Sequence, residues 1–165
     1  MRGFAIVLLA ALFAAAAAIL YATADSLPAQ VASHFDAGGY VNGYMARSSY
    51  LLFMSLVTFG VPLLIVELNI VLPRFAPRLV RIPARDYWFA PERRAETIAS
   101  INTSGMLTAS LITAFMIAVH LLVVEANRQS PPHIDNELLW VLLGVLVVGM
   151  LAWQFFRWRR FQRPG

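Results

Sequence analysis

The sequence predicts an all-α integral membrane protein: a four-helix bundle with both termini in the cytoplasm and a short structured loop outside. Hydrophobic residues make up 59% of the 165 residues and charged residues only 13%, whereas soluble domains carry about 25% charged residues. Four apolar runs are long enough for the roughly 20-residue helix that crosses a bilayer. The predicted helices are residues 4–23, 50–72, 98–124 and 138–156. The segments between them are short, so residues 1–165 are expected to form a single membrane domain.

The distribution of positive charge predicts the orientation. All 13 basic residues are arginine, and most lie at the N-terminus, between the second and third predicted helices, or in the tail. These are Arg2; Arg74, Arg78, Arg81, Arg85, Arg93 and Arg94; and Arg157, Arg159, Arg160 and Arg163. Because arginine-rich flanks stay in the cytoplasm, both termini are expected inside. The net charge of +4 then indicates topology and contact with lipid headgroups, and no nucleic-acid partner is expected.

The first apolar run has a second interpretation. Ala22-Thr23-Ala24 is similar to a signal-peptidase cleavage site. The run before it is, however, about 17 residues long, whereas the apolar part of a secretory signal has about 7 to 15. This length favours a permanent first helix.

The residue inventory excludes several kinds of chemistry. Cysteine is absent, which excludes disulfides, thiolate metal sites and cysteine nucleophiles. Lysine is absent as well, which excludes Schiff-base chemistry. The sequence contains no HExxH, GxSxG or glycine-rich phosphate motif. We therefore expect the protein not to be an enzyme.

The segment between the first two predicted helices contains several turn signals. Ser26-Leu27-Pro28 predicts the start of a short helical turn, in which Val31 and Phe35 would share one face. Gly38-Gly39 would end that turn, and Asn42-Gly43 is a strong signal for a tight turn.

Two histidines lie beside aspartates in the segments expected outside. The spacings are His34-x-Asp36 and His133-x-Asp135, and imidazole with carboxylate suits zinc or another divalent ion. A divalent metal bound by these four residues is one interpretation. The alternatives are that His34 ties the loop to itself, or that the loop recognises a small ligand or a peptide. Asp135 or Asn136 is also expected to cap the fourth helix.

Polar residues inside predicted helices are candidates for function, because they are costly in lipid. Glu67 and Asn69 lie near the cytoplasmic end of the second helix, and His120 lies near the outer end of the third. Glu67 is either functional or paired with an arginine of the following linker or with headgroups. Gly60 and Pro62 predict a kink in the second helix.

The second linker is expected to lie at the cytoplasmic headgroups. Tyr87 and Trp88 are aromatic residues of the kind that favour this interface, and they adjoin Arg93 and Arg94. Pro91 followed by Glu92 predicts the start of the third helix there. On that helix Ser100, Ser104 and Thr108 recur every four residues, which predicts tight helix packing with inter-helix hydrogen bonds, or a substrate path.

Residues 27–47, LPAQVASHFDAGGYVNGYMAR, resemble the pattern LPxx(I/V)PxHFNxxGxPDGWxxK. That pattern marks a bacterial membrane domain of unknown function in the N-terminal part of SdpI-type proteins, which act in immunity and signalling. The residues that match it, or replace a similar residue, are Leu27, Pro28, Val31, His34, Phe35, Gly39, Gly43, Tyr44 and Arg47. The departures are Ala32, Asp36, Val41 and Asn42. The resemblance implies a protein of the bacterial cytoplasmic membrane.

Two hypotheses about function follow. In the first, the protein is a membrane binding or signalling module, alone or in a homo- or hetero-oligomer, whose outer loop recognises a peptide or a membrane partner. In the second, it is a metal-binding or transport-linked subunit that uses the outer His and Asp residues with Glu67 on a polar path.

Overall fold

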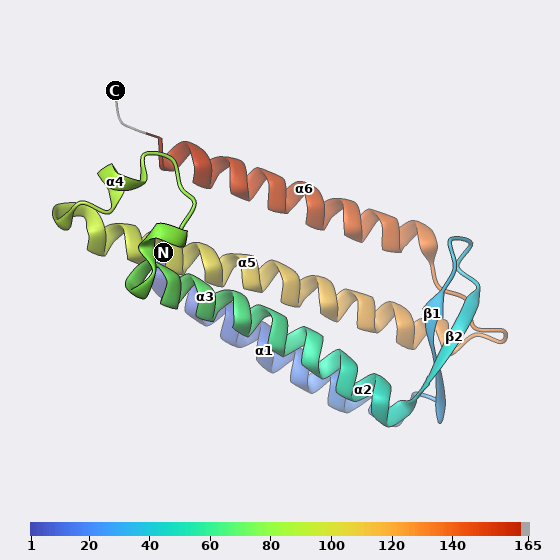
Figure 1. Ribbon diagram of the computed structural model, residues 1–165. Helices are drawn as coiled ribbons and strands as arrows, with labels where there is room; N and C mark the ends of the chain where they lie inside the picture. The colour runs from blue at the N-terminus through green and yellow to red at the C-terminus, as the bar shows by residue number, and fades with distance from the viewer. Residues whose placement is uncertain (163–165) are drawn as a thin grey trace.

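The computed structural model describes residues 1–162, and Arg163 lies outside them. Four long helical segments lie alongside one another, with a two-stranded sheet at one end of the bundle (Figure 1). The elements in chain order are α1 (Arg2–Ala24), β1 (Gln30–Phe35), β2 (Val41–Ala46), α2 (Arg47–Ser55), the π-helix η1 (Leu56–Gly60), α3 (Val61–Phe75), the 3-10 helix η2 (Pro77–Leu79), α4 (Arg85–Trp88), α5 (Pro91–Ala126) and α6 (Asn136–Arg160).

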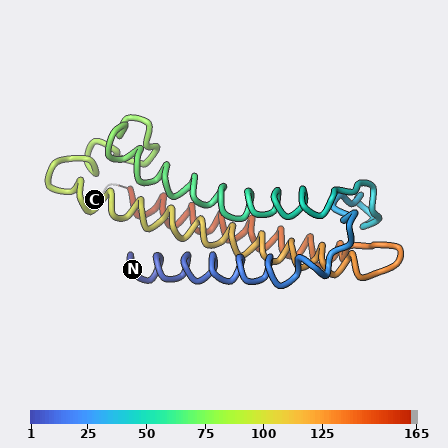
Figure 2. The backbone as a smooth tube through the Cα atoms, turned by 90° about the horizontal axis from the view of Figure 1, so that it is seen from below, coloured from blue at the N-terminus to red at the C-terminus, as the bar shows by residue number. Residues whose placement is uncertain are grey.

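The four helical segments are long and apolar enough to cross a bilayer, which confirms that prediction. They contain 23, 29, 36 and 25 residues, and at about 1.5 Å per residue each exceeds the roughly 30 Å of hydrocarbon. The start of α1 and the end of α6 lie at one end of the bundle, called here the termini end (Figures 1 and 2). The sheet and the loop 127–135 lie at the other, called the hairpin end.

The prediction of an all-α fold is wrong at the hairpin end. Instead of a helical turn, residues 30–46 form an antiparallel β-hairpin. Its turn is at residues 36–39, where the Asp36 carboxylate accepts hydrogen bonds from the N–H groups of Gly38 and Tyr40 at 2.9 and 3.0 Å and Gly39 takes a positive φ of 84°. The predicted tight turn at Asn42-Gly43 is therefore also wrong, because both residues lie within β2.

The helix α5 is the central element of the bundle. In its most apolar stretch 39% of the residues are buried within the protein, whereas the corresponding stretch of α6 has none. Figure 2 shows α5 between α1 and the α2–α3 segment. α6 is therefore a peripheral helix, which packs on the bundle through half-buried residues such as Leu139 and Leu142.

The interrupted segment α2–η1–α3 corresponds to the predicted kink. Pro62 has no N–H and leaves the carbonyl four residues earlier, at Thr58, without its usual helical partner. Thr58 lies in the five-residue π-helix η1, which Gly60 ends. The sequence thus signalled the position of the irregularity, and the structure resolves it as a wider helical turn.

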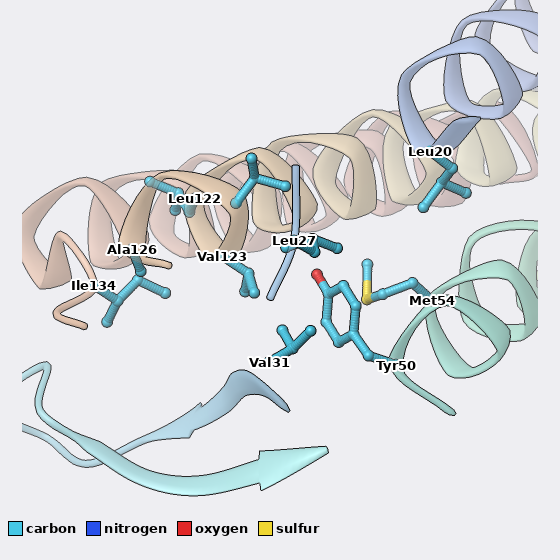
Figure 3. Packing of buried hydrophobic residues seen from close by; sticks show 10 residues of the cluster. Leu20, Leu27, Val31, Tyr50, Met54, Leu122, Val123, Ala126 and Ile134 are labelled. Carbon is cyan, nitrogen blue, oxygen red and sulfur yellow. The ribbon is translucent and has the colours of Figure 1, made fainter. Parts of the chain in front are cut away.

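The main hydrophobic cluster lies beneath the hairpin and joins α1, α2, α5 and β1 (Figure 3). Val31 of β1 is fully buried, and Tyr50 of α2 is 2% exposed. Both side chains lie close to Val123 of α5 in the cluster (Figure 3). The hairpin is therefore packed onto the helices and does not form a free loop.

Candidate ligand-binding site

The first strand of the hairpin is held by a side chain from the end of α5. Asn127 accepts from the N–H of Ala32 at 2.8 Å and donates to its carbonyl at 2.9 Å. These two bonds imitate a neighbouring strand and cover the outer edge of β1 at this point. The sheet has two strands within residues 1–162, so β2, beyond its contact near Tyr40, keeps an open edge.

The turn of the hairpin is held by the loop before α6. The N–H of Ile134 donates to the carbonyl of Gly39 at 3.0 Å, and Nε2 of His133 lies 3.2 Å from the carbonyl of Gly38. Asn136 donates to the carbonyl of Ala37. A side chain at residue 39 has no space, because an added Cβ would lie 2.7 Å from the Ile134 carbonyl oxygen. The two segments expected outside therefore do meet.

The structure does not assemble the predicted metal site from these segments. Among residues 1–162 no group of three or more His, Asp or Glu side chains is arranged to hold a metal ion. The Asp36 carboxylate binds the N–H groups of the hairpin turn, and Asp135 caps α6 by accepting from the N–H of Leu138 at 2.9 Å. The carboxylates expected to bind metal thus stabilise backbone, and the expected helix cap is confirmed at Asp135.

His34 is an exposed residue of β1 that borders clefts shared with α5, and β1 is irregular at this position. The strand register shifts on both sides of His34, which pairs with Gly43 rather than following the regular alternation. A β-bulge turns the next side chain to the other face of the sheet. His34 therefore lies on the face of Val31, and its Nδ1 lies 3.0 Å from the Ser33 hydroxyl.

Two clefts meet at His34. One, of about 240 Å³, is mostly apolar and has methionines 45, 54 and 116 in its wall. The other, of about 410 Å³, extends towards α6 and is lined in part by Asp36, Asn42 and Asn136. Both clefts are lined by Ser33 and His34 of β1 on one side. On the other side they share two valines of α5, Val119 and Val123. This site combines a flexible apolar surface with hydrogen-bonding groups at its rim.

A buried hydrogen-bond network lies directly beneath the hairpin. His120 is 1% exposed, and its Nε2 and Nδ1 lie 2.8 Å from the Thr23 hydroxyl and 2.9 Å from the Tyr50 hydroxyl. The Thr23 hydroxyl donates its proton to the carbonyl of Ile19 at 2.7 Å, so it accepts from Nε2–H. A neutral imidazole protonated at Nε2, with Tyr50 donating to Nδ1, fits these contacts, and the network joins α1, α2 and α5.

A further polar contact between helices compensates for the proline inside α3. Pro73 lies inside α3 and leaves the carbonyl of Asn69 without a helical donor. With its amide turned so that the nitrogen faces this carbonyl, the Asn102 side chain on α5 donates to it at 2.7 Å. Asn102 thus joins α3 to α5, whereas two residues of the predicted hydroxyl face, Ser100 and Ser104, line a cleft instead.

Glu67 is exposed on the surface of α3. The ion pairs within residues 1–162 involve Asp25, Asp86, Glu96 and Glu125. The predicted pairing of Glu67 with an arginine of the second linker is therefore absent. Glu67 lies about 12 Å along the helix from its end at Phe75.

The second linker folds back onto the end of α6. Nε1 of Trp88 donates to the carbonyl of Phe161 at 2.7 Å, and the Arg93 guanidinium stacks 3.9 Å above the ring of Tyr87. Pro91 begins α5, with Glu92 in its first turn, which confirms the predicted start of that helix. Arg94 donates to the carbonyl of Arg74.

The other residues of the resemblance have mixed roles. Leu27 is buried in the cluster beneath the hairpin, Tyr44 is exposed, and Arg47 lies 3.6 Å from Asp25. Asn127 and Ser33 were not predicted to matter. No sequence periodicity identifies Asn127, because its partner is 95 residues away in the chain.

The fold and the site define a membrane-spanning helical protein with a docked β-hairpin and an amphipathic site under it. Residues 7–65 match the family model described as Domain of unknown function (DUF1648). This range covers most of α1, the hairpin, α2, η1 and the beginning of α3. No curated protein and no solved structure matches the chain.

Proposed function

We propose that this protein is an integral membrane binding or signalling module whose hairpin recognises a peptide or a partner protein. The observation that carries the proposal is the pair of clefts meeting at His34. Their apolar floor suits a hydrophobic side chain, and the polar rim suits a main chain. The open edge of β2 offers further main-chain donors and acceptors to an extended peptide.

The proposal includes an SdpI-like role at the outer surface of a bacterial cytoplasmic membrane. The resemblance of residues 27–47 to SdpI-type proteins supports it, and those residues form the hairpin. The arginines of the second linker and of α6 support N-in and C-in orientation, since they lie at the termini end. Fusions of a periplasm-specific reporter after Gln129 and after Gln162 test this: activity is expected only from the first.

Photo-cross-linking in cells tests recognition at the site. A photoreactive phenylalanine at Asn42, within the larger cleft, is expected to give an adduct that the same residue at Gln129 does not give. His34→Ala should lower the adduct yield about fivefold. This factor corresponds to about 1 kcal/mol, the usual contribution of one hydrogen bond. Gln30→Ala is the matched control, because this exposed residue of β1 lines neither cleft. Absence of an adduct, or equal yields in both variants, rejects recognition at the cleft.

A further inference from the structure

At the termini end, α6 carries two side chains with unused hydrogen-bond donors. Nε1 of Trp153 is buried and has no hydrogen-bond partner. Arg157 is partly buried, and the ion pairs within residues 1–162 are formed by other arginines: Arg47, Arg85, Arg128 and Arg160. Because residues four apart share a helix face, both donors point to the same side of α6. Buried donors without partners are rare, so an acceptor that enters beside Trp153 would complete its hydrogen bonding.

Trp153 and Arg157 both line one cleft of about 400 Å³ between the start of α1, α5 and α6. Its charged side chains are three arginines, Arg2, Arg157 and Arg160, and one acid, Glu96. Glu96 lies 3.5 Å from Arg160, so it leaves the charges of the other two arginines unbalanced. The cleft is therefore electropositive.

Arg157 also lines two adjoining clefts, of about 260 and 200 Å³. Both contain Arg81 from the second linker, and neither has an Asp or Glu in its lining. Arg157 thus lines three clefts, and two of them have no acidic side chain in their lining. An anion is the group that balances such an arrangement.

The position and walls of the cleft identify the anion. Trp153 lies seven residues before the end of α6 at Arg160, about 10 Å along the helix and within reach of the headgroup region. Phe156 and Ala99 provide apolar wall beside the arginines, and Ser100 adds a hydroxyl. We propose that this cleft binds the phosphate of an anionic phospholipid from the leaflet at the termini end, with Arg157 and Trp153 as donors.

Lipid retention by the purified protein tests this site. Protein equilibrated in detergent with equal amounts of dioleoyl-phosphatidylglycerol and dioleoyl-phosphatidylcholine is analysed by native mass spectrometry. The wild type is expected to retain phosphatidylglycerol preferentially. Arg157→Gln should lower the ratio of retained phosphatidylglycerol to phosphatidylcholine at least about fivefold. Arg159→Gln is the matched control: Arg159 has the same charge on the same helix, is exposed, and lies over Phe155 away from the clefts.

Two results overturn the proposal. Equal retention ratios for the wild type and Arg157→Gln, or an equal loss in Arg159→Gln, mean that no specific site exists at Arg157. Displacement of the lipid by inorganic phosphate or by glycerophosphoglycerol at millimolar concentration means that the cleft takes a soluble anion instead. If Arg157→Gln does not fold, Trp153→Phe replaces it, because this change removes the unpartnered N–H and conserves an aromatic ring. It should lower the ratio about twofold to fivefold, and an unchanged ratio counts against the site.

Discussion

Gly105 of α5 lies directly against the side chain of Asn69 on α3. A Cβ added at Gly105 would lie 2.6 Å from the Cβ of Asn69, a distance that needs one of the two helices to move. Small residues allow this close approach of helices in a membrane. The contact also brings α3 to the place where Asn102 reaches the Asn69 carbonyl.

Gly105→Ala is expected to lower the free energy of unfolding by about 1–3 kcal/mol, the usual cost of overpacking a close contact. Gly144→Ala on α6 is the control, since an added Cβ there meets no atom within 4 Å and alanine favours helix. Reversible unfolding by sodium dodecyl sulfate in mixed micelles measures both. Equal values for the two variants would mean that α3 and α5 are not in close contact at this point.

Asn102→Leu should cost about 0.5–2 kcal/mol, the range for a hydrogen bond between membrane helices. The physical reason is that the Asn69 carbonyl loses the donor that stands in for the missing N–H of Pro73. Pro73→Ala restores a main-chain N–H, so in that background Asn102→Leu should cost less. The same unfolding assay gives the double-mutant cycle, and additive losses would contradict the role assigned to Asn102.

The sequence predicts the helices well because their signals are local. Length and hydropathy locate all four spans, and Pro91 and Asp135 mark the starts of α5 and α6. The hairpin could not be predicted in the same way. Its strands are stabilised by Asn127 and by the loop around Ile134, so its pairing depends on residues about 95 positions away. Turn signals in the isolated segment predict a turn at Asn42-Gly43. In the structure the turn lies at residues 36–39, where the loop before α6 contacts it.

The candidate site, like the fold, could be predicted from the sequence only in part. The sequence identifies His34 as a residue of interest from its composition alone, in a polar segment between apolar runs. Its orientation depends on register shifts that no residue type near it predicts. The carboxylates beside the histidines suggested metal ligands, because spacing does not reveal that Asp36 and Asp135 are already bound to backbone N–H groups.

Asn127→Ala is expected to loosen the hairpin without unfolding the bundle. The change removes both bonds to Ala32, each of which contributes about 1 kcal/mol, so the Ala32 amide should exchange its hydrogen about tenfold faster or more. Hydrogen exchange followed by mass spectrometry on the peptide containing β1 measures this. Gln129→Ala, an exposed change two residues further on, should leave exchange unchanged, and protection equal in the two variants would contradict docking by Asn127.

The protonation state of His120 is predicted by its two neighbours. Since Thr23 donates to Ile19 and accepts from Nε2, the ring should be the neutral Nε2–H tautomer, which nitrogen-15 chemical shifts of labelled histidine identify. Thr23→Val removes the acceptor, so the proton is expected to move to Nδ1, where the Tyr50 oxygen can accept it. Tyr50→Phe is the matched change at the other nitrogen, and it should keep Nε2–H because Thr23 remains. A ring that is Nδ1–H in the wild type, or that responds equally to both changes, would show that this network is arranged differently.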